Sequence, residues 1–272
     1  MSIAVRPPAG TAVATRPHIM SNRFLLAPTL LLIGSTSAIA QAPAKEPPPL
    51  WDAQVAASFV GTSGNSDTAS TGADFTAHRR GAVWLIDAAA TAVLTRSNDE
   101  KTAERYLGMV RGQRKLTPIL GVSAGEKLER DKFAGIDLRS ILDAGLTWAL
   151  VRRTTWTVDG VTALAWNHES RTLGSGIDHP VGLLQLLSRV PFGAAGDMTQ
   201  RFTYYPDFTT TSAYRSEAEL TAQAAMAAHL ALKIGYLLRY SNLPVPGFKK
   251  TDNTTTASVV LRWKAATPAP AP

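Results

Sequence analysis

The residues with the clearest capacity for chemistry are a histidine and a serine two positions apart. His168 and Ser170 follow Asn167 in a short polar segment. In acyl hydrolases a histidine removes the proton of a serine hydroxyl, which then attacks the substrate. Residues two positions apart share a face only where a strand continues through them, and this segment is expected to enter a loop running from 168 to 178. Loop polarity explains the pair as well, so we rank a lipase-like enzyme using His168 and Ser170 third and expect no enzymatic activity.

The remaining candidates predict neither a cofactor nor a metal site. His78, His179 and His229 are dispersed, without the spacing of metal ligands. The chain contains no cysteine, which excludes thiolate metal sites and a disulfide framework. The segment 61–67 contains glycines but precedes no helical pattern, which excludes a phosphate-binding loop.

Many ionisable residues recur at every second position, opposite rows of apolar residues. Between 230 and 240 the even positions are leucine, isoleucine and tyrosine, while Lys233 and Arg239 occupy odd positions. A period of two predicts β-strands with one apolar and one charged face. In a membrane barrel the charged face lines the lumen. The predicted lumen-lining network consists of Asp87, Arg105, Arg111, Asp137, Arg139, Asp143, Asp159, Arg215, Glu217, Glu219, Lys233 and Arg239.

These acids and bases are expected to neutralise one another. Unpaired charge in a confined space is costly, so we expect a charge-paired lumen that is plugged or narrowed. The alternative is a narrow pore of mixed charge that passes small hydrophilic solutes.

The elements that must position these charges are strands, and the alternation predicts twelve of them between Trp51 and Trp263. Helical periodicity competes only in the alanine-rich segment 220–232, where the charges nevertheless keep a period of two. The strand near 119–129 is less regular, because the neighbours Glu126 and Lys127 cannot both face inward. A further strand is expected near 180–190, and the strand near 197–205 has no clear face assignment.

Connections are expected to alternate between long polar loops, such as 96–102 and 242–252, and short turns. An even strand number, strands of about ten residues and this alternation predict a transmembrane outer-membrane antiparallel β-barrel. The aromatic residues near predicted strand ends, which suit interfacial girdles, are Trp51, Trp84, Tyr106, Trp148, Trp156, Tyr236, Tyr240 and Trp263.

The rival architecture is a soluble secreted β-sandwich or a lipocalin-like barrel, in which the apolar face would form the core. Soluble strands average about 5–6 residues, roughly half the length predicted here. Small residues such as Ala88, Ala90 and Ala92 also dominate several apolar faces and would fill a core poorly. Both observations favour the membrane barrel.

The N-terminus predicts export. Arg23 precedes the apolar run 24–33, and small residues end at Ala40, in the layout of a cleaved secretory signal peptide. The apolar run is too short for a membrane helix, which needs about 20 residues. Met20 gives the basic region a more usual length and makes a better start than Met1.

Four segments follow from this reading. They are 1–40, the N-terminal extension and signal peptide; 41–50, a Pro-rich linker; 51–263, the barrel; and 264–272, a disordered Ala/Pro tail. Cleavage removes three arginines and no acids, which lowers the formal charge from +7 to +4. So mild a charge on an exported protein does not predict binding to nucleic acid.

Several motifs, taken together and in order, resemble a known family. The segment 61–67 follows a strand that begins with tryptophan, and it is similar to the first hairpin of the domain-of-unknown-function 481 family. Further matches are 131–139, 145–148 and 244–252. The matching loop residues are Gly61, Gly64, Asn65, Asp67, Pro244, Pro246, Gly247, Lys250 and Asp252.

The resemblance covers residues 51–263, and members of the family are often labelled salt-induced outer-membrane proteins. It implies an outer-membrane β-barrel of uncharacterised role, with no established active site. Members tend to finish on an aromatic residue of the last strand, whereas here Trp263 is followed by 264–272. This departure is expected to weaken recognition by the outer-membrane assembly machinery.

The expected location is therefore the outer membrane, and the expected partners are the lipid bilayer, lipopolysaccharide, the assembly machinery and, for a pore, small hydrophilic solutes. Cations in the expected outer loops could pair with lipopolysaccharide phosphates. They are Arg96, Lys101, Arg130, Lys132, Arg171, Lys249 and Lys250. The expected function is a structural or envelope-stress role.

Overall fold

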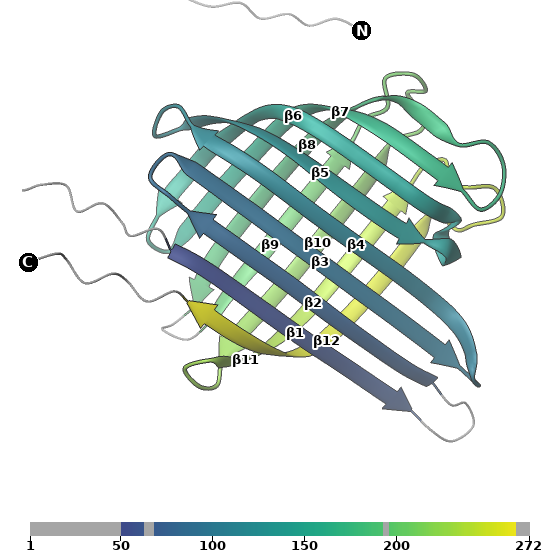
Figure 1. Cartoon of the computed structure of the whole chain (residues 1–272), viewed down its shortest axis with the longest axis horizontal. Helices are drawn as coiled ribbons and strands as arrows, with labels where there is room; N and C mark the ends of the chain where they lie inside the picture. The colour runs from purple at the N-terminus through teal and green to yellow at the C-terminus, as the bar shows by residue number, and fades with distance from the viewer. Residues whose placement is uncertain (1–49, 63–67, 193–195, 265–272) are drawn as a thin grey trace, which may run out of the picture. The chain divides into compact units, whose positions relative to one another are not determined.

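Twelve antiparallel strands close into a barrel in the computed structural model, which describes residues 50–62, 68–192 and 196–264 (Figure 1). Each strand pairs with its neighbours in the chain, and β12 pairs with β1, with Ala53 opposite Trp263. The strands are β1 (Leu50–Thr62), β2 (Thr68–Arg80), β3 (Trp84–Ser97), β4 (Glu100–Lys115), β5 (Leu120–Asp131), β6 (Ile136–Arg153), β7 (Trp156–Arg171), β8 (Ile177–Phe192), β9 (Gly196–Tyr205), β10 (Arg215–Ala225), β11 (Leu230–Ser241) and β12 (Thr251–Lys264). The predicted all-β barrel of about twelve strands is confirmed.

Some predicted segments are outside the described part of the chain. They are the signal peptide, the linker up to residue 49 and the tail from residue 265. In the ranges that are described, no helix is long and apolar enough to cross a membrane. A short 3-10 helix, η1 (Lys132–Ala134), connects β5 to β6.

The large apolar side chains of alternate positions face outward. Leu164 is 71% exposed, Phe59 70% and Ile234 63%, although all three lie within strands. A soluble barrel would bury these faces in its core, so the rival architecture does not fit. The outward apolar belt and the strand lengths, from 10 residues in β9 to 18 in β6, fit a barrel that crosses a membrane.

Strand β7 shows where the belt ends. Trp156 and Trp166 both face outward and bracket Leu164, in a segment of about the 9–11 residues that a tilted strand needs to cross the hydrocarbon. The strand continues beyond Trp166 to Arg171. The residues of β7 that follow Trp166 therefore lie outside the apolar belt.

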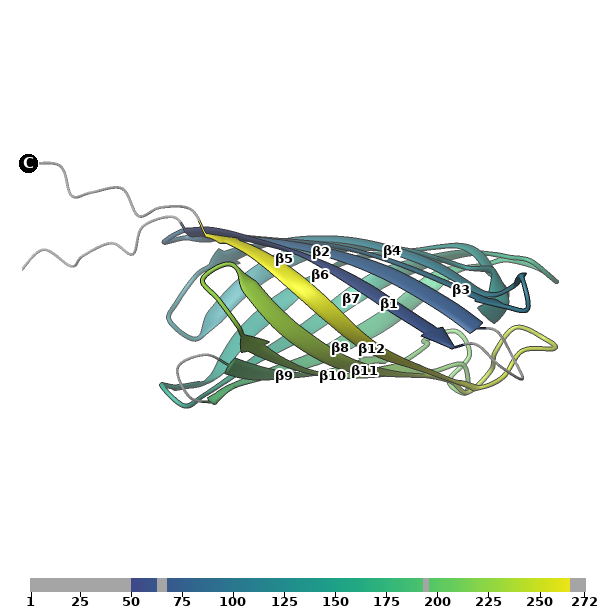
Figure 2. The same ribbon diagram turned by 90° about the horizontal axis from the view of Figure 1, so that it is seen from below.

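The two longest connections between described strands lie at the same end of the barrel (Figures 1 and 2). The β9–β10 connection runs from 206 to 214 and the β11–β12 connection from 242 to 250. We assign this end to the outside, because barrels of this class have short periplasmic turns and longer outer loops.

Two predicted loops are wrong. In place of the loop 96–102, β3 and β4 extend to a two-residue turn at Asn98 and Asp99, which have φ values of 49° and 64°. In place of the loop 168–178, β7 continues to Arg171 and β8 begins at Ile177. Strands that project beyond the bilayer carry polar residues on both faces, so polarity there does not mark a loop. The alanine-rich segment 220–232 contributes to β10 and β11, as predicted.

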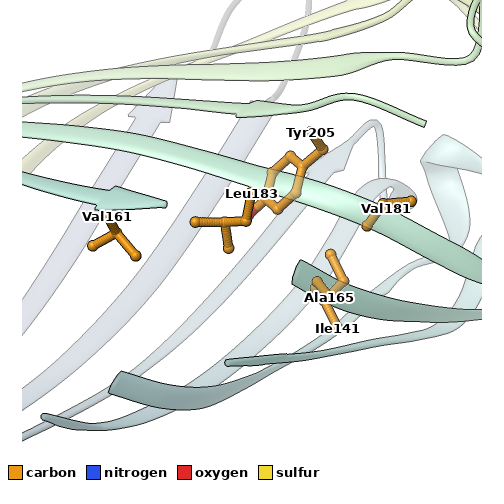
Figure 3. Packing of buried hydrophobic residues seen from close by; sticks show 6 residues of the cluster. All are labelled: Ile141, Val161, Ala165, Val181, Leu183 and Tyr205. Carbon is orange, nitrogen blue, oxygen red and sulfur yellow. The ribbon is translucent and has the colours of Figure 1, made fainter. Parts of the chain in front are cut away.

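An apolar cluster lies inside the barrel, on the wall formed by β6 to β9 (Figure 3). Its members, all buried, are Ile141, Val161, Ala165, Val181, Leu183 and Tyr205. They have the same strand parity as the lumen-facing charges of β6 and β7, since Ala165 is opposite Asp143 and Ile141 is opposite Asn167. The lumen is therefore packed with apolar as well as charged side chains.

Candidate functional site

Ion pairs cross the outer half of the lumen. Arg239 of β11 donates to Glu129 Oε1 at 2.9 Å and to Asp131 Oδ2 at 2.7 Å, both on β5. In the closed strand order, five strands separate β5 from β11 on either side, so these bonds join diametrically opposite walls. They close the space between the two walls at this level.

A second bridge lies beside the first. Lys127 of β5 donates to both carboxylate oxygens of Glu217 on β10, at 2.6 and 2.7 Å. The same ammonium group lies 3.5 Å from the Tyr205 hydroxyl, which belongs to the apolar cluster. The charged bridges and the apolar cluster therefore form one continuous packed layer.

Two buried glutamates, Glu129 and Glu169, accept hydrogen bonds from most of the arginines in the outer half of the lumen. Arg105 Nε donates to Glu129 at 3.0 Å, and Arg139 donates to Glu129 at 3.1 Å and to Glu169 at 2.7 Å. Arg171 Nε donates to Glu169 at 2.6 Å. Both glutamate side chains are only 2% exposed, and such burial is tolerable only because their oxygens accept charge-assisted hydrogen bonds.

Further pairs lie closer to the short-turn end. Arg111 donates to Asp143 at 2.6 Å and to Ser123 at 3.2 Å. Asp87 binds His78 at 2.6 Å and accepts from Gln113 at 3.0 Å.

The remaining members of the predicted network are more loosely held. Arg201 pairs with Glu219 at 2.9 Å, where both side chains are about one-third exposed. Arg152 pairs with Asp159 at the periplasmic end. Lys233 has lumen-facing parity, opposite Ser258, and makes no ion pair with any residue that the structure describes.

One predicted member, Asp137, does not join the network. A β-bulge between Ile136 and Leu138 disturbs the alternation at the start of β6. The Asp137 side chain is half-exposed and lies 3.7 Å from Arg130. Arg171 also departs from expectation, because it is bonded to Glu169 inside the barrel instead of being free for lipopolysaccharide.

In the irregular strand β5, the neighbours Glu126 and Lys127 face opposite sides, as expected from the sequence. Lys127 faces the lumen, while Glu126 faces outward and binds the Ser140 hydroxyl at 3.1 Å. This assignment also turns Glu129 and Asp131 inward. Sequence reasoning missed both acids, although their spacing from Lys127 has the period of two that would have found them.

A cavity of about 360 Å³ lies next to the ion pairs of Arg239 and Lys127, at the outer end of the barrel. Glu129, Arg139, Glu169 and Arg215 line it from the strands, and the β11–β12 connection lines it from above. Val245 of that connection is buried. We call this space the outer vestibule.

The family-signature residues divide between described and undescribed segments. Gly64, Asn65 and Asp67 lie outside the described residues, and Gly61 is in β1. Those of the second loop surround the outer vestibule or its edge: Pro244, Pro246, Lys250 and Asp252 line it, and Gly247 has a φ of 89°.

His168 and Ser170 share the outward face of β7, because the strand continues through them. His168 Nδ1 lies 3.7 Å from Asp178 Oδ1, which accepts a hydrogen bond from Trp166 Nε1 at 2.5 Å. Ser140 is opposite His168 in the register, but its hydroxyl is bonded to Glu126. In the described part of the chain, no hydrogen bond links His168 to a serine hydroxyl. No group of three or more acids and histidines in the same ranges could hold a metal ion.

A closed twelve-stranded barrel with an outward apolar belt and a charged lumen defines a transmembrane outer-membrane β-barrel. A family model described as "Protein of unknown function, DUF481" matches residues 55–263, and the chain belongs to this family. No curated protein matches the sequence.

Several solved outer-membrane barrels have a similar fold. The NanC porin is 13% identical, with 78% of this chain and 98% of that chain covered and a TM-score of 0.47. The COG4313 outer membrane channel from Pseudomonas putida F1 is 12% identical, with 82% and 99% covered and a TM-score of 0.48. The translocator domain of the autotransporter NalP from Neisseria meningitidis is 14% identical, with 81% and 90% covered and a TM-score of 0.40. These likenesses concern the fold alone.

Proposed function

We propose that this protein is a closed barrel with a structural or envelope-stress role in the outer membrane, rather than an open porin. The observation that carries the proposal is the bridge from Arg239 to Glu129 and Asp131 across the full width of the lumen. A solute passing this level would have to separate these groups.

Separating them is costly. Removing one partner of a buried ion pair leaves an uncompensated charge and costs about 3–5 kcal/mol. Displacing Glu129 would break its ion pairs with three arginines at once. The apolar cluster beside these ion pairs offers no counter-charge, so the closed state is the stable one.

Planar-bilayer recording tests this proposal with the refolded full chain. We expect the wild type to show no steady conductance. The double variant Arg239→Ala with Lys127→Ala should conduct, because it removes both cross-lumen bridges. Arg152→Gln is the matched control, since its pair with Asp159 lies exposed at the periplasmic end. A wild type that conducts as steadily as an open porin in the same bilayer would sink the proposal.

A narrow pore for small hydrophilic solutes is the second candidate. Along β11, β12 and β1, the lumen-facing residues Gly235, Ser258 and Ala56 are small, so this wall contributes little side-chain volume to the lumen. A small conductance in the wild type, lost on enlarging these residues, would favour the pore.

An enzymatic role has less support, and we propose that the chain is not a hydrolase. His168 and Ser170 both lie on the outward face of β7, and no hydrogen bond joins them in the ranges that the structure describes. Contacts of Lys249 and Lys250 with lipopolysaccharide phosphates, and recognition of the last strand by the assembly machinery, are also proposals. They rest on loop charge and on the β1–β12 closure.

A further inference from the structure

Arg215 is the arginine of the outer vestibule whose charge is least neutralised. The Glu169 carboxylate approaches its guanidinium only to 3.9 Å. Its NH2 group donates to the Asn167 amide oxygen at 3.4 Å, and the guanidinium lies 5.2 Å over the Tyr205 ring. Neither contact supplies a close negative charge.

The neighbouring arginines are paired far more closely. Arg139, Arg171 and Arg239 each donate to a carboxylate oxygen at 2.7 Å or less. Glu169 already accepts from two of them. Arg215 is therefore a third cation at Glu169, and it is the farthest of the three from the carboxylate.

The outer vestibule as a whole carries more positive than negative charge. Its basic lining residues are Arg139, Arg171, Arg215, Arg239, Lys249 and Lys250, and its acidic ones are Glu129, Glu169, Asp207, Glu217 and Asp252. Directly behind this lining lie two further bases, Arg105 and Lys127, and one further acid, Asp131. Together they make the net charge of the region more positive. Lys249 and Lys250 are exposed, so their charge faces arriving solutes.

The cavity has the size of a small-molecule site. Its volume of about 360 Å³ lies at the lower end of the range of about 300–1,000 Å³ for ligand pockets. Asn167 and Tyr205, which face the lumen, also line it and offer an amide and a hydroxyl group to a hydroxylated ligand.

We propose that the outer vestibule binds a small anion that carries a carboxylate or phosphate group, with Arg215 as its main contact. The planar guanidinium presents paired N–H donors that match the two oxygens of such a group. The surplus positive charge attracts the anion, and Tyr205 holds the guanidinium from below. The inference rests on the proposed closed lumen, which gives the cavity its floor.

Isothermal titration calorimetry of the full chain, refolded in micelles, tests the site. Gluconate and inorganic phosphate are the probes, and glucose is the neutral match for gluconate. We expect both anions to bind, more weakly as salt is added, and glucose not to bind at the same concentration. Arg215→Gln should weaken gluconate binding about tenfold to a hundredfold, because it removes a charged hydrogen-bond donor.

Arg201→Gln is the matched control, since Arg201 also faces the lumen but lies outside the vestibule. It should bind gluconate like the wild type. Equal binding of glucose and gluconate, or unchanged binding in Arg215→Gln, would overturn the proposal. If that variant does not fold, Arg215→Lys tests the site instead, because it keeps the positive charge and loses the paired N–H donors of the guanidinium. Unchanged gluconate affinity in this variant would count against the site.

Two further measurements distinguish the source of the anion and separate this inference from the closed-barrel proposal. Competition by lipopolysaccharide in vesicles would identify a lipid phosphate as the occupant, and its absence would identify a free solute. A conducting wild type that still binds gluconate contradicts the closed-barrel proposal alone. A silent wild type that binds no anion contradicts this inference alone.

Discussion

Glu129 is the residue on which the packing of the outer lumen converges. Its two oxygens accept from Arg105, Arg139 and Arg239, which belong to β4, β6 and β11. The side chain is 2% exposed. One carboxylate therefore links two adjacent strands to the opposite wall.

Replacing Glu129 by glutamine should destabilise the barrel by about 3–5 kcal/mol, since three buried guanidinium groups lose their shared counter-charge. Unfolding in urea, followed by tryptophan fluorescence in micelles, measures the loss. Glu219→Gln is the matched control: its pair with Arg201 is one-third exposed, so the expected loss is about 0–1 kcal/mol. Equal losses in the two variants would contradict a special role for Glu129.

At the scale of residues, the sequence predicts the strand face on which a side chain lies better than it predicts the ion-pair partner of that side chain. Alternation places Arg105, Arg111 and Arg239 on the charged face, and the structure has them in buried ion pairs. The partner of Arg239 lies 110 positions away along the chain. Pairing across a lumen depends on which strands stand opposite after closure, and on the parity of β5, where a shift of one residue exchanges the two faces.

At the scale of elements, strand number and type follow from the sequence, while strand ends do not. Polar residues near 168 and 178 predict a loop, yet they continue β7 and begin β8. Hydropathy signals a strand only inside the bilayer, and these strands extend past it. The sequence also leaves the faces of β9 unassigned, because Tyr205 of this strand belongs to the apolar cluster on the lumen side.

The β3–β4 turn offers a test of an element boundary. Asn98 and Asp99 both have positive φ, the conformation of a type I′ hairpin turn, in which glycine is favoured at the second position. Asp99→Gly should therefore stabilise the barrel by about 0.5–1 kcal/mol, because glycine adopts this conformation without steric cost. Asp99→Ala should destabilise it, and denaturant midpoints compare the three proteins. Lower stability of the glycine variant would argue against this turn.

At the scale of the whole molecule, the outward belt and the packed lumen divide the apolar residues between two environments. Leu164 and Ile234 face outward, whereas Leu183 and Val181 fill the interior. A soluble protein would have a single apolar core. The division explains why a chain with 45% apolar residues can line its lumen with charge.

The belt predicts that the cost of an outward charge depends on its height. Ala90 lies on the outward face near the middle of β3, between Trp84 and Arg96, and is opposite Phe75 and Gly108. Ala90→Arg should cost about 2–4 kcal/mol, the loss expected at the bilayer midplane. Ser170→Arg, beyond the end of the belt on β7, should cost about 0–1 kcal/mol.

Urea unfolding in lipid vesicles measures both losses, and the heat-modifiable gel band of the outer-membrane fraction shows whether each variant still assembles. Ala90→Leu controls for side-chain size and should leave stability unchanged or raised, because leucine is favourable in lipid. If Ala90→Arg and Ser170→Arg were equally stable, or if the wild type were recovered only as a soluble periplasmic protein, the outward face of β3 would not be in contact with lipid.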